Sequence, residues 1–510
     1  MNTRGLIVAL VLAVMATSSA SSRATVAPAS PACIPRVNAP AAGRLTLIET
    51  KSLDARTTDL TLHSPAMQRD VHVNVMLPVG YNPRGGRRYP VLYLLHGALG
   101  GYMNWFTDGH VEKLIGRRPL IVVMPDGGYD GSYSDWYGLL QGQSGPVPAW
   151  ETFHVHELIP YIDLHYPTLA TRGERFIAGL SAGGGGSTHY AADNPGLFGA
   201  VGSFSGANDN LEQYPFYPTL SEGLWLATDA PGDGPDGHCT WGDPYTQRVV
   251  WEDNDPTYLA PNLRATPLWI ASGNGEPGPL DPTPTSNAGQ DLSNAGGEAA
   301  AAATEMEIWD MTRSFVRALN GAGIPHADYF YGPGTHSWPY WRRDLKRFLS
   351  WLAPYIGHPV PAPGAFSYRT ANTAFSAWGW RFNVSHRDVR EFVYLTGIRS
   401  AGLDARGSGT LSVTTAPLYP PGQRYVVDAD ARRELTRADR TGRLHFTVEL
   451  GPSHRVQQYG FGPGTAASWQ ATTVTIRRRW SSTSLGPRSR PAHRGRRRRG
   501  GPRTRPDTAP

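Results

Sequence analysis

Cysteine is scarce in this sequence, which has two in 510 residues. A chain of this length with 40% apolar residues can bury a core without crosslinks, so a scaffold built on disulfides is excluded. Uninterrupted apolar runs are short, and none reaches the roughly 18 residues that a membrane-spanning helix needs. The 58 glycines and 44 prolines predict many loops, which argues against an all-helical bundle.

The chain before residue 477 has no net positive charge, although the formal net charge of the whole sequence is +6. Residues 477–510 hold twelve arginines and a single acidic residue, Asp507, so the rest of the chain carries a net charge of −5. The basic character therefore belongs to a C-terminal tail. The part of the chain that can fold is mildly acidic, and its composition gives no reason to expect a nucleic-acid partner.

The first residues have the pattern of a secretory signal peptide. Arg4 precedes an apolar run over residues 6–16, and Ser18 and Ala20 are the small residues that suit a cleavage site. We therefore expect residues 1–24 to be a signal peptide. The protein is then secreted, either to the extracellular space or to the cell envelope.

The two cysteines leave a question open. Cys33 lies near the start of the exported chain, and Cys239 lies in a loop rich in glycine, aspartate and proline. In an oxidising compartment they either form one bridge or stay as two free surface thiols.

Strand and helix signals alternate over residues 45–357. Residues 89–95 and 120–124 are apolar runs of strand length, each ending in glycine or proline turns, which favours strands buried on both faces of a mostly parallel sheet. Residues 150–166 predict an amphipathic helix that Pro160 bends. The pattern predicts an α/β catalytic domain with helices on both faces of the sheet. Further strands are expected at 71–75, 175–179, 200–204, 267–271 and 328–331, and further helices at 298–319 and 341–352.

The pattern changes after residue 357. Residues 358–364 are rich in proline and predict a stiff linker. Residues 365–476 contain short alternating strands between turn residues, which predicts a small antiparallel β-sandwich that carries no catalytic motif and serves as an accessory or binding module. Residues 477–510 are rich in arginine, proline, serine and glycine, and predict a disordered tail.

A G-x-S-x-G motif at residues 179–183 is the sharpest chemical signal. By itself it is compatible with an ordinary glycine-rich loop, but here an apolar strand leads in and small residues follow. Strand, sharp turn and helix together expose a serine hydroxyl at the carboxyl edge of a sheet, so Ser181 is the candidate nucleophile. Three more glycines at residues 184–186 disfavour the first turn of that helix.

A nucleophilic serine needs a base and donors for an oxyanion. His336 follows the last expected strand in a Gly/Pro loop, where an imidazole can reach the sheet edge, and it is the candidate base. The backbone N–H groups of Ala98 and Ala182 are the candidate oxyanion donors. His96, after a central strand, is a less favoured second base.

Cofactor and metal signals are weak. Residues 273–278 match the dinucleotide pattern G-x-G-x-x-G, but Pro277 and Pro279 prevent the helix that would bind a pyrophosphate. His154 and His156 do not have the spacing of metal ligands, and the motif H-E-x-x-H is absent. We expect no cofactor and no metal.

Five short motifs follow one another along the chain. They are S-D-W-Y at 134–137, W-E-T-F at 150–153, G-L-S-A-G at 179–183, G-N-G at 273–275 and T-H-S-W at 335–338. In this order they resemble the esterase D and antigen 85 mycolyltransferase family, over residues 65–355. The resemblance implies an α/β-hydrolase fold, a Ser-Glu-His triad and acyl transfer between esters, typically onto sugar or glycerol hydroxyls in the cell envelope.

The acid of the triad has more than one candidate. Reasoning from the residues, an acid directly after the strand that ends at Ala271 favours Glu276 or Asp281. The resemblance instead favours Glu305, which lies on the following helix ten residues before Phe315. Solvated charges on an ordinary helix face are the alternative explanation for the acidic residues there.

Two positions depart from the family pattern. His96 and Leu99 stand where the transferases carry an aspartate and an arginine that hold the sugar, so trehalose is not expected as acceptor. Trp338 matches the tryptophan that lines the acceptor cleft.

These observations favour a secreted serine acyltransferase or carboxylesterase with an acyl ester or glycolipid substrate and a sugar or glycerol acceptor. The other hypothesis is a cell-envelope binding protein or adhesin on a hydrolase scaffold, attached through the β domain and the tail.

Overall fold

The computed structural model describes residues 33–36, 39–129, 132–211, 239–281, 298–385, 389–430, 432–459 and 469–479. The expected signal peptide and residues 480–510 of the expected tail lie outside the described residues. Within the described ranges, no helix is long and apolar enough to cross a bilayer.

Nine strands of the described chain form one mixed sheet, in the order β11-β10-β9-β8-β5-β6-β4-β3-β2. The six strands from β11 to β6 are parallel, and β4, β3 and β2 extend the sheet in antiparallel pairing. The strands are β2 (Thr46–Ser52), β3 (Thr57–Ser64), β4 (Arg69–Met76), β5 (Val91–Leu95), β6 (Ile121–Pro125), β8 (Arg175–Leu180), β9 (Ala200–Phe204), β10 (Leu268–Ser272) and β11 (Ala327–Phe330). The expected mostly parallel sheet is confirmed.

The apolar runs form strands because both of their faces are buried. In β5, Leu92 and Leu94 pack into one hydrophobic cluster, while Val91, Tyr93 and Leu95 pack into another on the opposite face. Alternate side chains of a strand point to opposite faces, so a strand covered on both sides is apolar throughout. The sheet and its two helical layers have the α/β-hydrolase architecture that the resemblance implied.

Helices cover both faces of the sheet. The cluster on one face includes side chains of α4, α5 and α8, and the cluster on the other includes side chains of α2, α3 and α9. The expected helix at 150–166 starts as a π-helix, η2, and becomes α4 next to Pro160. The helices are α2 (Asn104–Thr107), α3 (Val111–Ile115), η2 (Thr152–Leu158), α4 (Ile159–His165), η3 (Arg172–Glu174), α5 (Ala182–Asp193), α7 (Arg248–Asp253), η4 (Ala260–Leu263), α8 (Glu298–Gly321), α9 (Trp338–Leu352) and η5 (Ala353–Tyr355).

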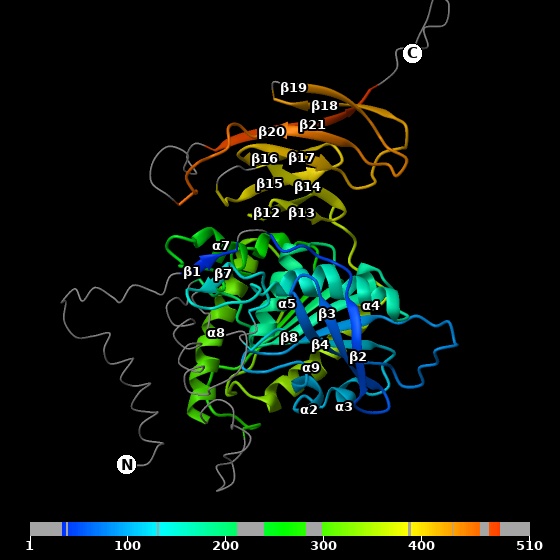
Figure 1. The fold of residues 1–510 in the computed structure, drawn as a ribbon, viewed down its shortest axis with the longest axis vertical. Coiled ribbons are helices and arrows are strands. Elements are labelled where there is room, and N and C mark those ends of the chain that lie inside the picture. Colours follow the sequence, from blue (N-terminus) through cyan, green and yellow to red (C-terminus); the bar gives the residue numbers. More distant parts are fainter. Residues whose placement is uncertain are drawn as a thin grey trace, which may run out of the picture.

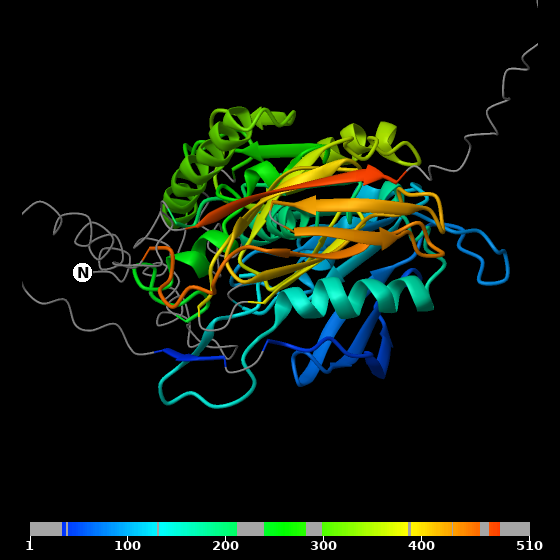
Figure 2. The same cartoon turned by 90° about the horizontal axis from the view of Figure 1, so that it is seen from above.

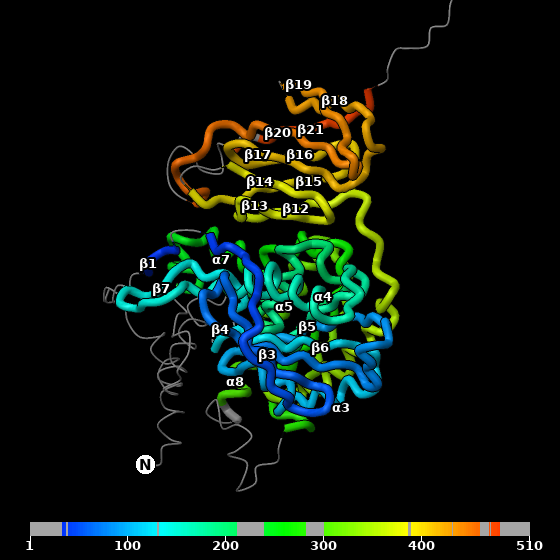
Figure 3. Tube along the Cα trace, turned by 45° about the vertical axis from the view of Figure 1, so that its right-hand side comes forward, coloured from blue at the N-terminus to red at the C-terminus, as the bar shows by residue number. Residues whose placement is uncertain are grey.

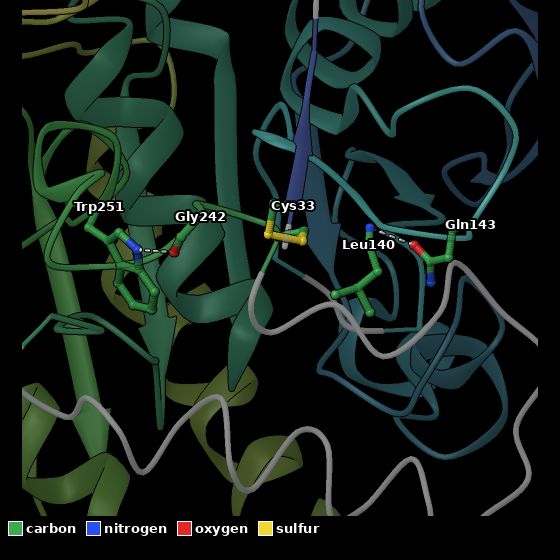
Figure 4. The surroundings of a disulfide bond; sticks show 6 residues. Cys33, Leu140, Gln143, Gly242 and Trp251 are labelled. Atoms are coloured by element: carbon green, nitrogen blue, oxygen red, sulfur yellow. Dashed lines mark hydrogen bonds between the residues drawn. A yellow bond between two sulfur atoms is a disulfide. The ribbon is translucent and has the colours of Figure 1, made fainter. Parts of the chain in front are cut away.

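The two cysteines form a disulfide, Cys33–Cys239, which settles the question that the sequence left open. Cys33 begins β1 (Cys33–Pro35), which pairs antiparallel with β7 (Gly138–Leu140). The N–H of Gly138 donates to the carbonyl of Cys239 over 3.1 Å, so backbone pairing and the disulfide hold the same three segments together (Figure 4).

Residues after 365 form two antiparallel sheets that enclose a second hydrophobic core. In the described residues their orders are β12-β15-β16-β21-β18-β19 and β13-β14-β17-β20. This arrangement is the expected sandwich, and the domain boundaries drawn from the sequence stay predictions. The strands are β12 (Phe366–Thr370), β13 (Ala374–Ala377), β14 (Trp380–Ser385), β15 (Val393–Arg399), β16 (Gly402–Gly407), β17 (Thr410–Thr414), β18 (Arg424–Ala429), β19 (Arg432–Arg437), β20 (His445–Glu449) and β21 (Gln470–Arg478).

The sandwich contacts the α/β part through polar side chains and through Ala371, Phe392 and Trp469, which belong to the hydrophobic cluster of the α/β part. Strands β12 and β13 are nearest to the α/β part, and from above the sandwich strands run across it (Figures 1, 2 and 3). The hydroxyl of Tyr368 donates to the carbonyl of Asp193 over 2.6 Å, and the amide of Asn372 donates to the Asp193 carboxyl over 3.1 Å. Arg390 donates to Asp253 over 2.7 Å. The sandwich is therefore held at the C-terminal end of α5.

A buried carboxyl lies behind this contact. Glu151 accepts from Asn194 over 3.1 Å and contacts Nε2 of His189 at 3.1 Å. Burial, reinforced by the nearby charge of Asp135, raises the pKa of Glu151 to about 8. Burial and the charge of Glu151 also raise the pKa of Asp193. The folded protein therefore keeps a proton here that the unfolded chain would release near pH 4.5.

We expect the free energy of unfolding to fall as pH rises from about 4.5 to about 8, because the unfolded state then binds fewer protons than the folded state. In Glu151→Gln the side chain is neutral at every pH, so much of this loss disappears. At pH 8 the free energy of unfolding of the variant exceeds that of the wild type by on the order of a few kcal/mol. Urea unfolding at pH 5, 6.5 and 8 measures it. A surface control, Glu49→Gln on the exposed strand β2, keeps the wild-type slope, and an unchanged slope in Glu151→Gln would contradict the prediction.

Candidate active site

Ser181 lies at the sharp turn between β8 and α5. Its backbone has φ 54° and ψ −125°, a left-handed conformation that is strained for a residue with a side chain. The segment at the end of β9 holds it there through two hydrogen bonds: the N–H of Ser181 donates to the carbonyl of Phe204 over 2.9 Å, and its carbonyl accepts from the N–H of Ala207 over 3.1 Å. The hydroxyl is thereby fixed at the carboxyl edge of the sheet.

Glycines around Ser181 permit backbone contacts that no side chain could make. A Cβ on Gly179 would lie 2.2 Å from the carbonyl oxygen of Gly183, and one on Gly183 would lie 2.3 Å from the carbonyl oxygen of His96. A Cβ on Gly185 would lie 2.1 Å from the carbonyl oxygen of Ala207. The expectation that residues 184–186 disfavour the first turn of α5 is therefore wrong, because close packing outweighs the helix propensity of glycine.

His336 lies in the loop between β11 and α9 and contacts Ser181 directly. Its Nε2 is 2.8 Å from Oγ of Ser181, and its Nδ1 is 2.6 Å from Oε2 of Glu305. The backbone N–H of His336 donates to the carbonyl of Ala301 on α8, and the edge of Trp341 packs against the ring at 4.9 Å between centroids. With its proton on Nδ1, the imidazole leaves Nε2 to accept the serine proton.

Glu305 is fully buried on α8, and its second oxygen is also satisfied. Oε1 accepts from Oγ of Ser205 over 2.9 Å, from Oγ of Ser272 over 3.0 Å and from the N–H of Gly273 over 2.7 Å. A buried carboxylate is tolerated when donors surround it. These donors were not predicted from the sequence, although small polar residues at the carboxyl ends of β9 and β10 were the signal that could have found them.

The other candidate acids make different contacts. Glu276 is exposed and accepts from the side chain of Asn274 over 3.1 Å. Asp281 accepts from the hydroxyl of Tyr340 over 2.9 Å and from the hydroxyl of Thr335. Among the described residues, neither acid is hydrogen-bonded to the imidazole. The carboxyl that contacts His336 is that of Glu305, the residue the family resemblance favoured, and not an acid directly after β10.

The two expected oxyanion donors have free N–H groups. Within the described ranges, neither the N–H of Ala98 nor that of Ala182 donates a hydrogen bond to protein. Ala182 is the first residue of α5, so its N–H also carries the partial positive charge of a helix N-terminus. Both N–H groups can donate to a ligand oxygen.

His96 has a structural role. The imidazole is buried, its Nδ1 is 2.8 Å from the carbonyl of Gly97, and its Nε2 accepts from the N–H of Gly127 over 2.9 Å. Both ring nitrogens are therefore occupied, which leaves no role as a second base. Among the described residues there is also no group of three or more metal-ligand side chains that could hold an ion.

Trp338 lies at the start of α9, two residues after His336. Its indole packs edge to face against Trp105 and Trp341, each at 5.3 Å between centroids. It is half-buried, whereas Trp105 is fully buried. An aromatic surface thus stands beside the imidazole, where a substrate or acceptor could pack.

Comparisons with known proteins agree with this geometry. Residues 64–352 match a family described as "Putative esterase". An esterase of Mycobacterium tuberculosis (strain ATCC 25618 / H37Rv) is 28% identical over 318 residues, which cover 61% of this chain. The match spans 62% of that relative's own length.

Two further matches reach nearly the full length of the other protein. The diacylglycerol acyltransferase/mycolyltransferase Ag85B of Mycolicibacterium smegmatis is 31% identical over 304 residues, 58% of this chain and 85% of the relative. The solved structure of MPT51 of Mycobacterium tuberculosis is 24% identical with a TM-score of 0.45, and it covers 60% of this chain and all of that one.

We expect a fluorophosphonate probe to label Ser181, because its hydroxyl donates to an imidazole that a carboxylate orients. Ser181→Ala abolishes labelling. Glu305→Gln slows it by about 10³-fold or more, since a neutral amide no longer stabilises the imidazolium. The measurement is the labelling rate by intact mass.

Glu276→Gln is the matched control, with the same change at the alternative acid, and it labels at the wild-type rate. Loss of labelling in Glu276→Gln but not in Glu305→Gln would reverse the assignment of the acid. Absence of labelling in the folded wild-type protein would favour the binding-protein hypothesis.

Proposed function

The chain belongs to the putative esterase family, and from this we propose that it is a serine-dependent acyl-ester enzyme that works through an acyl-enzyme on Ser181. The observation that carries the proposal is the hydrogen-bonded chain from Oγ of Ser181 through His336 to Glu305. This chain aligns a nucleophile, a base and an orienting carboxylate at the edge of the sheet, as acyl transfer requires.

In the first step, Oγ of Ser181 attacks the ester carbonyl carbon while Nε2 of His336 takes the serine proton. Glu305 keeps the proton of Nδ1 in place and stabilises the imidazolium. The carbonyl oxygen becomes an oxyanion and accepts from the N–H groups of Ala98 and Ala182. One such donor contributes about 3 kcal/mol to the transition state in serine enzymes. Nε2 then gives its proton to the leaving alcohol, and the acyl group stays on Ser181.

In the second step, a water molecule or an alcohol enters beside His336. Nε2 takes its proton, the new oxygen attacks the acyl carbon, and Ser181 leaves with the proton returned from Nε2. The family includes relatives named as esterases and as acyltransferases, and the acceptor decides between the two outcomes.

The residues around the oxyanion loop favour water, or a small alcohol, over trehalose. His96 stands at the position of the sugar-holding aspartate, and its ring is buried with both nitrogens engaged. Leu99, at the position of the arginine, has no polar side chain to offer. Trp338 supplies an aromatic surface for a sugar or glycerol acceptor, and an acyl ester or glycolipid is the substrate class that fits.

We further infer that the enzyme is secreted or held in the cell envelope. The signal-peptide pattern at residues 1–24 supports this, and so does the Cys33–Cys239 disulfide, because such bonds persist in oxidising compartments.

With a p-nitrophenyl ester of a short acid, we expect the free acid as the main product and no acyl trehalose when trehalose is added. Glycerol and glucose are tested in parallel, and mass spectrometry of the products identifies any acyl transfer. Ser181→Ala is the control and forms product only at the rate of spontaneous hydrolysis. Acyl trehalose as the main product would show that the acceptor site does not need the aspartate and arginine missing here.

A further inference from the structure

Charge is divided unequally along the chain. Residues 1–364 contain 33 acidic and 23 basic residues, whereas residues 365–476 contain 13 arginines against eight acidic residues. Residues 480–510 add nine arginines and one aspartate. The sandwich and the segment after it therefore carry positive charge that the α/β part lacks.

Four arginines of the sandwich lie on one exposed face of the six-stranded sheet. The register of β18, β19 and β21 pairs Arg424 with Arg437, Val426 with Arg477, and Asp428 with Arg433. Paired residues lie on the same side of a sheet, and side chains alternate along each strand. The intervening residues Tyr425, Val427 and Ile476 belong to the core, so this set faces outward. We call Arg424, Arg433, Arg437 and Arg477 the arginine face.

One carboxylate serves this face. Asp428 pairs with Arg433 at 3.2 Å and also with Arg477, and these arginine side chains are 71% and 66% exposed. Arg437 donates to the backbone carbonyl of Gly422 over 2.6 Å. Among the described residues, Asp428 is the one carboxylate paired with arginines of this face, and four guanidinium groups against it leave a net positive charge.

An exposed leucine lies among the arginines. Leu435 is opposite Val426 in the register, stands between Arg433 and Arg437 along β19, and is 56% exposed. A charged polymer in water gains nothing from an exposed leucine. The leucine does strengthen binding to an anionic lipid surface, because the arginines bind the headgroups while the leucine enters the apolar layer beneath them.

We propose that the arginine face binds an anionic lipid surface. The strands β18, β19 and β21 form the end of the sandwich farthest from the α/β part (Figures 1 and 3), and the sequence after Arg479 contains nine further arginines. The face therefore attaches the protein without covering Ser181. This inference goes beyond the proposed enzymatic function and does not depend on it.

The test uses the full chain and vesicles of phosphatidylcholine with 25% phosphatidylglycerol, in a co-sedimentation assay at 50, 150 and 400 mM NaCl. Wild type binds these vesicles, does not bind vesicles of phosphatidylcholine alone, and is released as salt rises. Arg424→Glu/Arg433→Glu/Arg437→Glu weakens partitioning by about tenfold or more at 150 mM NaCl. The control Arg84→Glu/Arg117→Glu/Arg317→Glu makes the same charge change on exposed arginines of the α/β part and binds like wild type.

A second pair of variants separates a lipid surface from a soluble polyanion. Leu435→Ser weakens vesicle binding severalfold and leaves binding to dextran sulfate unchanged, while Leu418→Ser, at another exposed leucine of the sandwich, changes neither. An equal loss of vesicle binding in both triple variants, or no loss of vesicle binding in either, would overturn the inference. An unaltered Leu435→Ser would overturn the lipid assignment in favour of a polymer. Thermal unfolding of each variant, followed by circular dichroism, shows that the sandwich stays folded. This control needs no reactive serine, so the result is separate from the enzymatic one.

Discussion

The close approach of α5 to the backbone of its neighbours is the constraint on which the candidate site depends. Gly183 and Gly185 press against the carbonyl groups of His96 and Ala207 at distances that exclude any side chain. That contact fixes the start of α5, and the start of α5 fixes the strained backbone of Ser181. The strain is sustained because two hydrogen bonds to the segment at the end of β9, at Phe204 and Ala207, hold the backbone of Ser181 in this conformation.

The candidate site also requires a buried carboxylate, and the structure stabilises it by surrounding its oxygens with hydrogen-bond donors. Glu305 has no exposure, yet two hydroxyls, one backbone N–H and the imidazole surround its carboxyl group. The two hydroxyls and the N–H come from the ends of β9 and β10, so the sheet edge that presents the serine also supplies hydrogen-bond donors to the acid. The position of the nucleophile and the stabilisation of the acid therefore depend on one architectural feature, the alignment of the parallel strand ends.

Local sequence patterns predicted the parts of the fold and site that local physics determines. The buried parallel strands follow from apolar runs, and Ser181 and His336 follow from a strand-turn-helix motif and a loop after the last strand. Glu305 could not be derived this way, because its meeting with His336 depends on how α8 packs across β10 and not on any neighbouring residue. The glycines at 184–186 misled the helix prediction for the same reason. Gly184 and Gly185 pack against the backbone after β9 and Gly186 packs against Tyr133, and these partners are distant in sequence.

The sandwich is more closely joined to the α/β part than its composition suggested. A proline-rich linker and a change of strand pattern favour an independent module, but Tyr368, Asn372 and Arg390 donate to carboxyl or carbonyl groups of Asp193 and Asp253. Asp193 ends the helix that Ser181 begins, so the two ends of α5 face different tasks: the first positions the nucleophile and the last receives the sandwich. Buried carboxyls at that junction are a poor way to gain stability, since each must stay protonated or be paired. These carboxyls instead specify how the sandwich is oriented on the α/β part. Only a surface with donors at these positions satisfies them, whereas a purely apolar contact would allow more than one orientation.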